Sequence, residues 1–450
     1  MLAQIIAVVI FVAMFAMIIM DVTENYKITL TCALATIVIL FGVVMHSPKA
    51  IINTLALKQM VSLPFWYESG HATSDSSGIN WATIIFILGM MIMVEGMAKS
   101  GFFRWLCMTL AKAVGYRVIP LFITFMLISA ILSMFIASIT VILFLASITL
   151  EIADLLEVDP VPMIIAEIFC SNLGGAATMS GDPPNIILGT SLGYTFGDFM
   201  SNTGLMSGIC LIFVLIYFYL VYRKTYSKGG KNINPESFPA PATAIKSKTG
   251  FAESTIIFAL TVVLLITHAQ TGLTVASIGA IAAILTLICA GRSIPTVLKG
   301  VDYKTLLFFI GLFVVVCGVE ETGILGLIAT FIKNVSGGNA MIMVAIIIWV
   351  SACASAIIDN IPFVATMIPV IKSLSAATGV SLPMLAWALS MGTDIGGSAT
   401  PIGASANVIG TSVSAKDGHP ISWGRYCKAA IPVTAIVILI SMLIIFARYL

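Results

Sequence analysis

The sequence predicts an all-α protein that crosses a membrane many times. Of its 450 residues, 59% are hydrophobic and 9% are charged, whereas soluble domains carry about 25% charged residues. The apolar residues form continuous runs that approach the roughly 20 residues a helix needs to cross a bilayer, and they do not alternate as barrel strands do. Lipid cannot satisfy backbone hydrogen bonds, so such runs favour a helical bundle. The composition excludes a soluble globular protein, and a net charge of +2 gives no reason to expect a nucleic-acid partner.

Eight runs are long enough to cross the membrane as unbroken helices. They are 3–20, 28–46, 81–98, 202–222, 252–268, 272–290, 303–319 and 428–448. The first run has no basic segment before it and no small-residue cleavage site, so we interpret it as a span and not as a removable signal peptide. The eight cysteines are scattered and lie mostly in apolar runs, which indicates packing residues and predicts neither a disulfide framework nor a metal site.

Two further segments, 158–192 and 383–412, predict helices that are broken within the membrane. Gly, Pro and polar residues interrupt each of them: SNLGGAATMSGDPPNIILGTS begins at Ser171, and TDIGGSATPIGASANVIGTS begins at Thr393. The interruptions match at one constant offset in residue number, the repeat offset, which pairs Gly174 with Gly396, Gly175 with Gly397, Thr178 with Thr400, and Asn185 with Asn407. Broken helices at matching places in two halves are typical of a transporter's binding site, because helix ends carry partial charge and unwound backbone leaves polar groups free.

Two apolar stretches, 118–150 and 340–375, are too long for one span and predict hairpins. Polar residues lie midway along each stretch, in the sequences ASIT at 137–140 and DNIP at 359–362. Each stretch predicts a re-entrant hairpin whose tip is buried in protein or faces water. The same repeat offset matches Ser138 of the first tip with Asn360 of the second.

The matched segments predict two inverted repeats, each with five spans, one of them broken, and one re-entrant hairpin. The first repeat is 1–222, a linker occupies 223–251, and the second repeat is 252–450. Lys and Arg gather in the linker and in three other loops, and placing these in the cytoplasm puts both termini outside. An odd number of spans then inverts the second repeat relative to the first.

Three shorter segments add to this organisation. The stretches 101–117 and 323–336 mix apolar with basic residues and predict helices that lie along the membrane surface. The stretch 58–80 is a polar insert, rich in Gly and Ser, that the second half lacks.

Carboxylates inside the membrane are the main functional candidates, because a charge at the bilayer centre costs at least about 2.5 kcal/mol. Asp182 and Asp394 lie in the interruptions, and Asp359 lies at the second hairpin tip. We predict that these three bind an ion; the alternative for each is a structural cap on a broken helix. For Glu95 and Glu167, a solvated position near a helix end is the alternative to a role in proton coupling.

Neutral oxygens gather at the same four places. Carbonyl, amide and carboxylate oxygens suit hard cations such as Na⁺, free N–H groups beside glycines suit an anion, and polar side chains that merely bridge helices are the structural alternative. Besides the three carboxylates, the predicted ion-binding residues are Ser138, Thr140, Ser171, Asn172, Gly174, Gly175, Thr178, Asn185, Asn360, Thr393, Gly396, Gly397, Thr400 and Asn407. The candidate Na⁺ ligands are Asn172, Asp359, Asn360 and Asp394. We expect no cofactor, and the chain has no HExxH or Walker pattern that would indicate a zinc-dependent enzyme or a nucleotide-driven pump.

These motifs resemble those of a known group of transporters. SNLGGAAT at 171–178, followed by GDPPNI at 181–186, is similar to the signature of the arsenite-permease, NhaD-type sodium–proton antiporter and P-protein group of the ion transporter superfamily. IIDNIPFVAT at 357–366 and ASANVIG at 404–410 resemble its second-half counterparts, so the resemblance covers about 81–427. It implies a scaffold domain and a transport domain in each protomer, usually in a homodimer, with the transport domain moving as an elevator in the cell (inner) membrane.

One departure from the group concerns the first hairpin tip. Members that resemble the P-protein carry Asp-Asn there, whereas this chain carries Ala137-Ser138, and its Ser-Ile-Thr is similar to the Ser-Asn-Thr tips of dicarboxylate symporters. The acidic ligands therefore fall to Asp359, Asp394 and Asp182. The leading hypothesis is Na⁺/H⁺ antiport. The alternatives are a permease for arsenite or another small anion, dicarboxylate or citrate symport, which the lack of Lys and Arg in the interruptions disfavours, and an ion channel.

Overall fold

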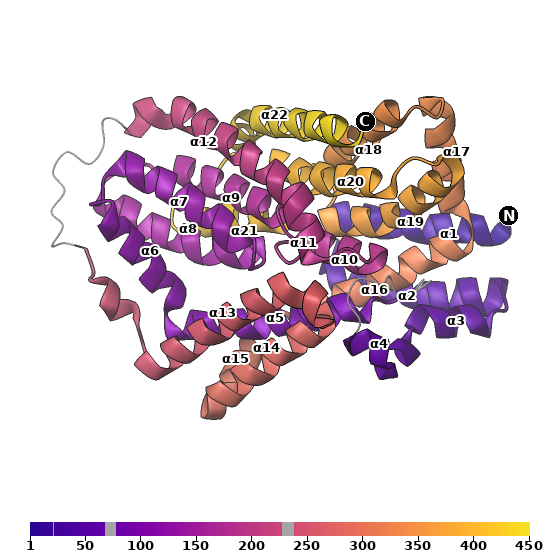
Figure 1. Ribbon diagram of the computed structural model, residues 1–450, viewed down its shortest axis with the longest axis horizontal. Helices are drawn as coiled ribbons and strands as arrows, with labels where there is room; N and C mark the ends of the chain where they lie inside the picture. The colour runs from indigo at the N-terminus through magenta and orange to yellow at the C-terminus, as the bar shows by residue number, and fades with distance from the viewer. Residues whose placement is uncertain (21, 68–77, 227–237) are drawn as a thin grey trace.

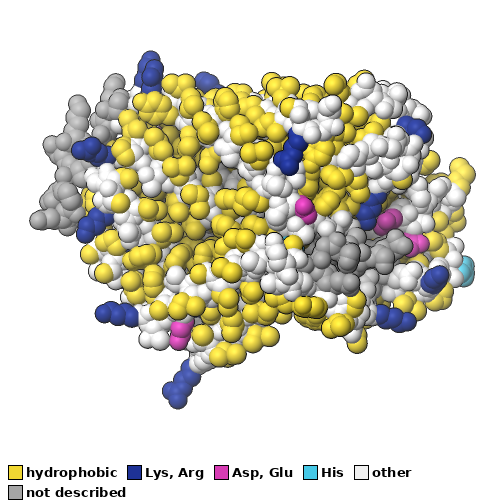
Figure 2. All heavy atoms as spheres, in the orientation of Figure 1, with side chains coloured by type: hydrophobic (Ala, Val, Ile, Leu, Met, Phe, Trp, Pro, Cys, Tyr) yellow, Lys and Arg dark blue, Asp and Glu magenta, His cyan; other side chains and the backbone are white. Residues whose placement is uncertain are grey.

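The computed structural model describes residues 1–20, 22–67, 78–226 and 238–450. In these residues the regular structure is helical, apart from one isolated bridge between Tyr67 and Leu273, and ten helices are long and apolar enough to cross a membrane. Hydrophobic side chains cover most of the face shown in Figure 2, as expected for a surface in contact with lipid. The prediction of an all-α polytopic membrane protein is confirmed.

All eight predicted unbroken spans are helical. They are α1 (Leu2–Ile19), α2 (Asn25–Ala35), which continues as a π-helix over Thr36–Val44, α5 (Trp81–Ser100), α12 (Leu205–Tyr226), α13 (Lys248–Thr271), α14 (Val275–Ala290), α16 (Tyr303–Glu321) and α22 (Trp423–Tyr449). Local sequence sets several of their ends. Asn80 caps the start of α5 by accepting the N–H of Thr83, and Gly101 ends it with a φ of 90°, a conformation that favours glycine.

Each predicted hairpin is a pair of helices joined by a short turn. The pairs are α7 (Val118–Ser133) with α8 (Ser138–Leu155), and α18 (Ala340–Ser355) with α19 (Asn360–Thr378). In the second hairpin, Asp359 caps α19 by accepting the N–H of Ile361 at 3.2 Å. The turns are residues 134–137 and 356–359, so Ala137 and Asp359 of the predicted tips end the turns, whereas Ser138 and Asn360 begin α8 and α19. The re-entrant depth of both hairpins in the bilayer stays a prediction.

Both predicted broken helices are interrupted. The first consists of α9 (Val161–Ala176) and α10 (Pro183–Leu192). The second consists of α20 (Leu382–Gly396), a 3₁₀ turn over Gly397–Ala399, and α21 (Ser405–Lys416). Proline explains where the helix restarts, since Pro183 and Pro184 occupy the first turn of α10, where no backbone N–H is needed.

The remaining helices are short or amphipathic. The two segments predicted to lie along the membrane surface form α6 (Phe102–Ala113) and α17 (Ile324–Ser336), and the connecting helices are α3 (Pro48–Leu55), α4 (Leu63–Trp66), α11 (Phe196–Phe199) and α15 (Ile294–Gly300). The predicted insert 58–80 and linker 223–251 lie partly outside the described residues. The surface placement, the inverted repeats and the domain bounds stay predictions.

The two halves of the chain are interleaved. α5 of the first half packs on α14 of the second, and α16 of the second half packs on α2 of the first. In the interior, α10 packs on α19, and α21 packs on α8 and α9. Figure 1 shows α5, α13 and α14 together at the lower edge of the view, with the broken helices above them. Helices of each half therefore pack directly against helices of the other half.

Glycines make the closest of these helix contacts possible. A Cβ added to Gly89 in α5 would lie 2.0 Å from the carbonyl oxygen of Gly279 in α14, and one added to Gly279 would lie 2.6 Å from the Cα of Phe86. Gly311 in α16 meets the backbone of Thr29 in α2 at 2.6 Å in the same way. The backbones touch directly, which is how small residues join helices in membranes.

The variant Gly89→Val should lower the thermal midpoint of the purified protein in detergent, because the added side chain overpacks the crossing at a cost of about 1–3 kcal/mol. Gly208→Val is the matched control, since a Cβ added there in α12 meets nothing within 4 Å. Equal shifts in the two variants would show that the α5–α14 contact does not depend on glycine.

Candidate functional site

An asparagine side chain closes the interruption in each broken helix. The Nδ2 of Asn185 and the Nδ2 of Asn407 each donate to backbone carbonyls that the end of the preceding helix leaves free. The acceptors are the carbonyl oxygens of Gly175, Ala176 and Thr178 in the first interruption and of Gly397 and Thr400 in the second, at 2.7–3.3 Å. These bonds satisfy buried backbone groups that would otherwise be costly at this depth.

The side chains of the two interruptions also contact each other. The Oδ1 of Asn185 accepts a hydrogen bond from Ser390 in α20 at 2.7 Å, and the Oδ1 of Asn407 accepts one from Asn172 in α9 at 2.8 Å. Asn172 donates to Ser398 as well, at 3.0 Å. All five side chains are buried. The structure therefore brings the Gly-rich segments of the two halves into one polar centre.

Each half places one carboxylate against one hydroxyl, between its hairpin and its broken helix. In the first half, Ser138 at the start of α8 donates to the Oδ1 of Asp182 before α10, at 2.5 Å. In the second half, Ser405 at the start of α21 donates to the Oδ2 of Asp359 before α19, at 3.1 Å. The acid lies on the broken helix in one half and on the hairpin in the other. The first hairpin tip has no acid, and Asp182 on the broken helix is the carboxylate of the pair in that half.

Asp394 is the least satisfied polar group of the centre. Its side chain is fully buried, and neither of its oxygens has a hydrogen-bond partner among the described residues, although the amide of Asn185 lies nearby. Asp394 lies within electrostatic range of Asp182, which in turn lies within range of Asp359. It takes the position that Asn172 has in the first half. A buried ionised carboxylate in this state is strongly unfavourable, so Asp394 requires a proton or a bound cation.

The predicted glycines serve packing. A Cβ on Gly174 would lie 2.0 Å from the carbonyl oxygen of Ala130, and one on Gly396 would lie 2.3 Å from the Cα of Ala352, so both broken helices touch a hairpin through their backbones. Gly174, Gly175 and Gly396 lie inside α9 and α20, and Gly397 lies in the 3₁₀ turn. Their N–H groups are therefore used within helices, in contrast to the sequence-based expectation of free donors for an anion.

Several predicted hydroxyls hold the interruptions to the hairpins. Thr178 donates to the carbonyl of Met134, and Thr400 donates to that of Ala356 at 2.5 Å. Ser171 contacts the carbonyl of Ser138 at 3.3 Å, whereas Thr393 bonds within its own helix. In the described part of the chain, Thr140 and Asn360 make no side-chain hydrogen bond, which leaves the Asn360 amide at the second tip available to a ligand.

Sequence reasoning missed three serines of the centre. Ser405 and Ser398 lie within the second interruption, but the repeat offset matches neither of them with a polar residue of the first half. Ser390 lies one helical turn before Asp394, and this spacing on one helix face is the signal that could have identified it.

The two glutamates have different surroundings. Glu95 lies at the end of α5, partly exposed, with its Oε1 3.5 Å from the Nζ of Lys99, which agrees with the solvated alternative. Glu167 is fully buried in α9 and accepts a 2.6 Å hydrogen bond from Thr149. The solvated alternative does not hold for Glu167.

Helices long and apolar enough to span a membrane, together with two interrupted helices that meet in a buried polar centre, are the architecture of a membrane transporter. The chain belongs to the citrate transporter family (CitMHS), whose sequence profile matches residues 15–392.

Relatives with similar sequences include proteins named as a transporter and as a membrane protein. The chain is 31% identical to an uncharacterized transporter, Rv2685, of Mycobacterium tuberculosis over 99% of both chains. It is 30% identical to a 46 kDa membrane protein of Mycobacterium leprae, over 87% of this chain and 92% of that protein. It is 27% identical to the human P protein over 90% of this chain, which corresponds to 57% of the P protein.

Two solved structures have a similar fold. The YdaH transporter of Alcanivorax borkumensis superposes with a TM-score of 0.57 over 89% of this chain and 97% of its own, at 13% identity. MtrF of Neisseria gonorrhoeae, described as one of a class of antimetabolite efflux pumps, superposes with the same TM-score over 88% of this chain and 84% of its own, at 12% identity. At this level of identity the likeness supports the fold alone.

The variant Asn407→Ala should destabilise the protein strongly, because it leaves two carbonyls and the Asn172 amide without their partner, and each such buried group costs about 1–3 kcal/mol. Asn334→Ala, at an exposed position in α17, is the control. The thermal midpoint in detergent measures both. Similar midpoints would mean that the asparagine does not hold the two interruptions together.

Proposed function

We propose that this protein is a secondary transporter that exchanges Na⁺ for H⁺ by alternating access. The observation that carries the proposal is Asp394, a fully buried carboxylate with both oxygens unpartnered among the described residues, beside two carboxylate–hydroxyl pairs. The hairpin tips and interruptions contain no Lys or Arg. Carboxylate, amide and hydroxyl oxygens suit a hard monovalent cation, and a proton is the other partner that a buried carboxylate accepts.

The helix ends support a cation more than an anion. The positive N-terminal end of α19 already holds the carboxylate of Asp359, and Asp182 is the residue that precedes α10. Pro183 and Pro184 further remove two N–H groups that an anion at α10 would use. An anion such as citrate would therefore need co-bound cations to balance the acids already present.

Exchange needs no further group. When Asp394 and the two pairs hold Na⁺, the negative charge is neutralised; when Na⁺ leaves, protons neutralise the same oxygens and let the buried centre move. Because the acids can cross the membrane only when they are neutralised, the empty and charged site cannot cross, and each crossing carries either Na⁺ or H⁺. The movements of the two ions are therefore coupled. As in the elevator that the family resemblance implies, the hairpins and broken helices would move against α5 and α16, in each protomer of a homodimer.

In proteoliposomes, an imposed pH gradient should drive Na⁺ flux through the wild-type protein, and Asp394→Asn or Asp359→Asn should reduce that flux about tenfold to a hundredfold, since each removes a charged ligand worth about 1.5–3 kcal/mol. Glu321→Gln, an exposed acid at the end of α16, is the control and should transport normally. Wild-type flux in both aspartate variants would remove these residues from the site.

The second candidate is cation-coupled transport of citrate or another small anion such as arsenite, which the family's description and the resemblance favour. The same vesicles distinguish it: uptake of labelled citrate or arsenite that requires Na⁺, together with Na⁺ flux that ignores the pH gradient, would replace antiport with symport. Na⁺ flux without any counter-ion stoichiometry, at rates above those of carriers, would indicate a channel.

A further inference from the structure

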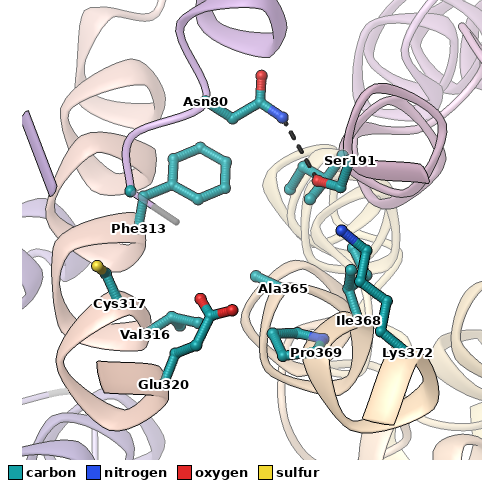
Figure 3. Close-up of a pocket in the computed structure, with 12 residues that line it drawn as sticks. Asn80, Ser191, Phe313, Val316, Cys317, Glu320, Ala365, Ile368, Pro369 and Lys372 are labelled. Atoms are coloured by element: carbon teal, nitrogen blue, oxygen red, sulfur yellow. Dashed lines mark hydrogen bonds between the residues drawn. The ribbon is translucent and has the colours of Figure 1, made fainter. Parts of the chain in front are cut away.

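A cavity of about 60 Å³ lies between helices that the elevator arrangement assigns to different domains. α16 and the residues before α5 form one side, and α10 and α19 form the other (Figure 3). Its lining includes Asn80, Ser191, Phe313, Glu320, Ala365 and Lys372. Ala365 lies six residues beyond Asp359 on α19, which is about 9 Å along a helix. The cavity therefore lies along α19 on the C-terminal side of Asp359, the acid of the second hairpin tip.

The cavity carries two opposite charges on facing walls. Figure 3 shows the carboxylate of Glu320 reaching from α16 into the space between the two helices, and the side chain of Lys372 on the other side of that space, extending from α19 toward Ser191. The two attract each other but are too far apart for an ion pair, since none joins them in the described part of the chain. Asn80 donates to Ser191 across the same space at 3.5 Å. An acid and an amine held apart in this way leave room for a small ion.

We propose that this cavity is a second cation site, a vestibule where Na⁺ binds to the Glu320 carboxylate before it reaches Asp359, and where the Lys372 ammonium is a tethered competitor. This inference rests on the proposed function. The size supports it: a water needs about 10–15 Å³ and a cavity of about 150 Å³ holds benzene, so 60 Å³ fits a cation with a few waters and not a citrate.

In this proposal the charges of Glu320 and Lys372 have different roles. An approaching cation is attracted by Glu320, which belongs to α16, and displaces Lys372, whose flexible stem can swing aside because the residue is exposed on α19. When the cavity is empty, the ammonium neutralises the carboxylate from a distance. The lysine therefore sets the Na⁺ concentration at which the vestibule fills, and its removal should increase the affinity.

Kinetics of Na⁺ uptake into proteoliposomes test the inference. Glu320→Gln should raise the KM for Na⁺ about tenfold with little change in maximal rate, because a charged ligand is replaced by a neutral one. Lys372→Gln should lower the KM. Glu321→Gln is the matched control, because Glu321 is the next residue on the helix and is not part of the cavity lining, and it should leave the KM unchanged. A wild-type KM for Glu320→Gln, or equal effects of the two glutamate variants, would overturn the vestibule while leaving antiport intact.

A labelling experiment gives an answer even if the wild-type protein moves no Na⁺, in which case the proposed function fails by itself. Ser191→Cys places a thiol in the cavity, and its labelling is measured as the increment over the wild-type protein. A cationic methanethiosulfonate reagent should react several-fold faster than an anionic one of similar size. Glu320→Gln in the same background should abolish this preference. Faster reaction of the anionic reagent would show that Lys372 controls the cavity and that it takes anions.

Discussion

A carboxylate removed from water must hold a proton or a cation, and this constraint governs the centre of the protein. Asp182 and Asp394 are buried and Asp359 is partly buried. Asp394 lies within electrostatic range of Asp182, and Asp182 within range of Asp359, while the hairpin tips and interruptions around them contain no Lys or Arg. The oxygens of two acids find hydroxyl donors, but those of Asp394 find none among the described residues. A site built in this way is stable only when protons or cations neutralise its carboxylates. In the proposed antiport, Na⁺ neutralises these carboxylates on one side of the membrane and H⁺ on the other.

The same centre depends on an exchange of parts between the two halves. Asn172 of the first half bonds Asn407 of the second, and Asn185 of the first accepts from Ser390 of the second. Around them, α10 packs on the second hairpin and α21 on the first. Because side chains and helices of each half contact the interruption of the other, the two broken helices and two hairpins pack together as one unit. In the proposed elevator this unit would move against α5 and α16, where the cavity with Glu320 and Lys372 lies.

Much of this arrangement could be predicted from the sequence, because local signals set it. The apolar runs predict the spans, and Gly-Asp-Pro-Pro predicts the first break, since proline removes the N–H that a continuous helix needs. The repeat offset pairs Asn185 with Asn407, and these two side chains make equivalent hydrogen bonds. These are features of a few consecutive residues or of a repeat, and both are visible in one sequence.

Contacts between distant segments could not be predicted in this way. The glycines of the interruptions suggest free N–H donors, but Gly174 and Gly396 serve close packing against hairpins that are distant in the chain. The repeat offset matches Ser405 with no polar residue of the first half. In the second half the hydroxyl of Ser405 lies on the broken helix and the acid Asp359 on the hairpin, whereas in the first half Ser138 lies on the hairpin and Asp182 on the broken helix. The burial of Glu167 likewise depends on the helices packed around α9. Each of these facts is set by tertiary contacts that no local pattern records.

The most direct test of the central claim is the number of protons released when Na⁺ binds. Isothermal titration of the detergent-solubilised protein with NaCl, in buffers of different ionisation enthalpy, measures this number without any transport step. If the buried acids alternate between the two ions, Na⁺ binds and releases protons, and Asp394→Asn loses a large part of the release. Na⁺ binding with no proton release, or binding of citrate alone with no cation, would contradict the claim that these carboxylates exchange Na⁺ for H⁺.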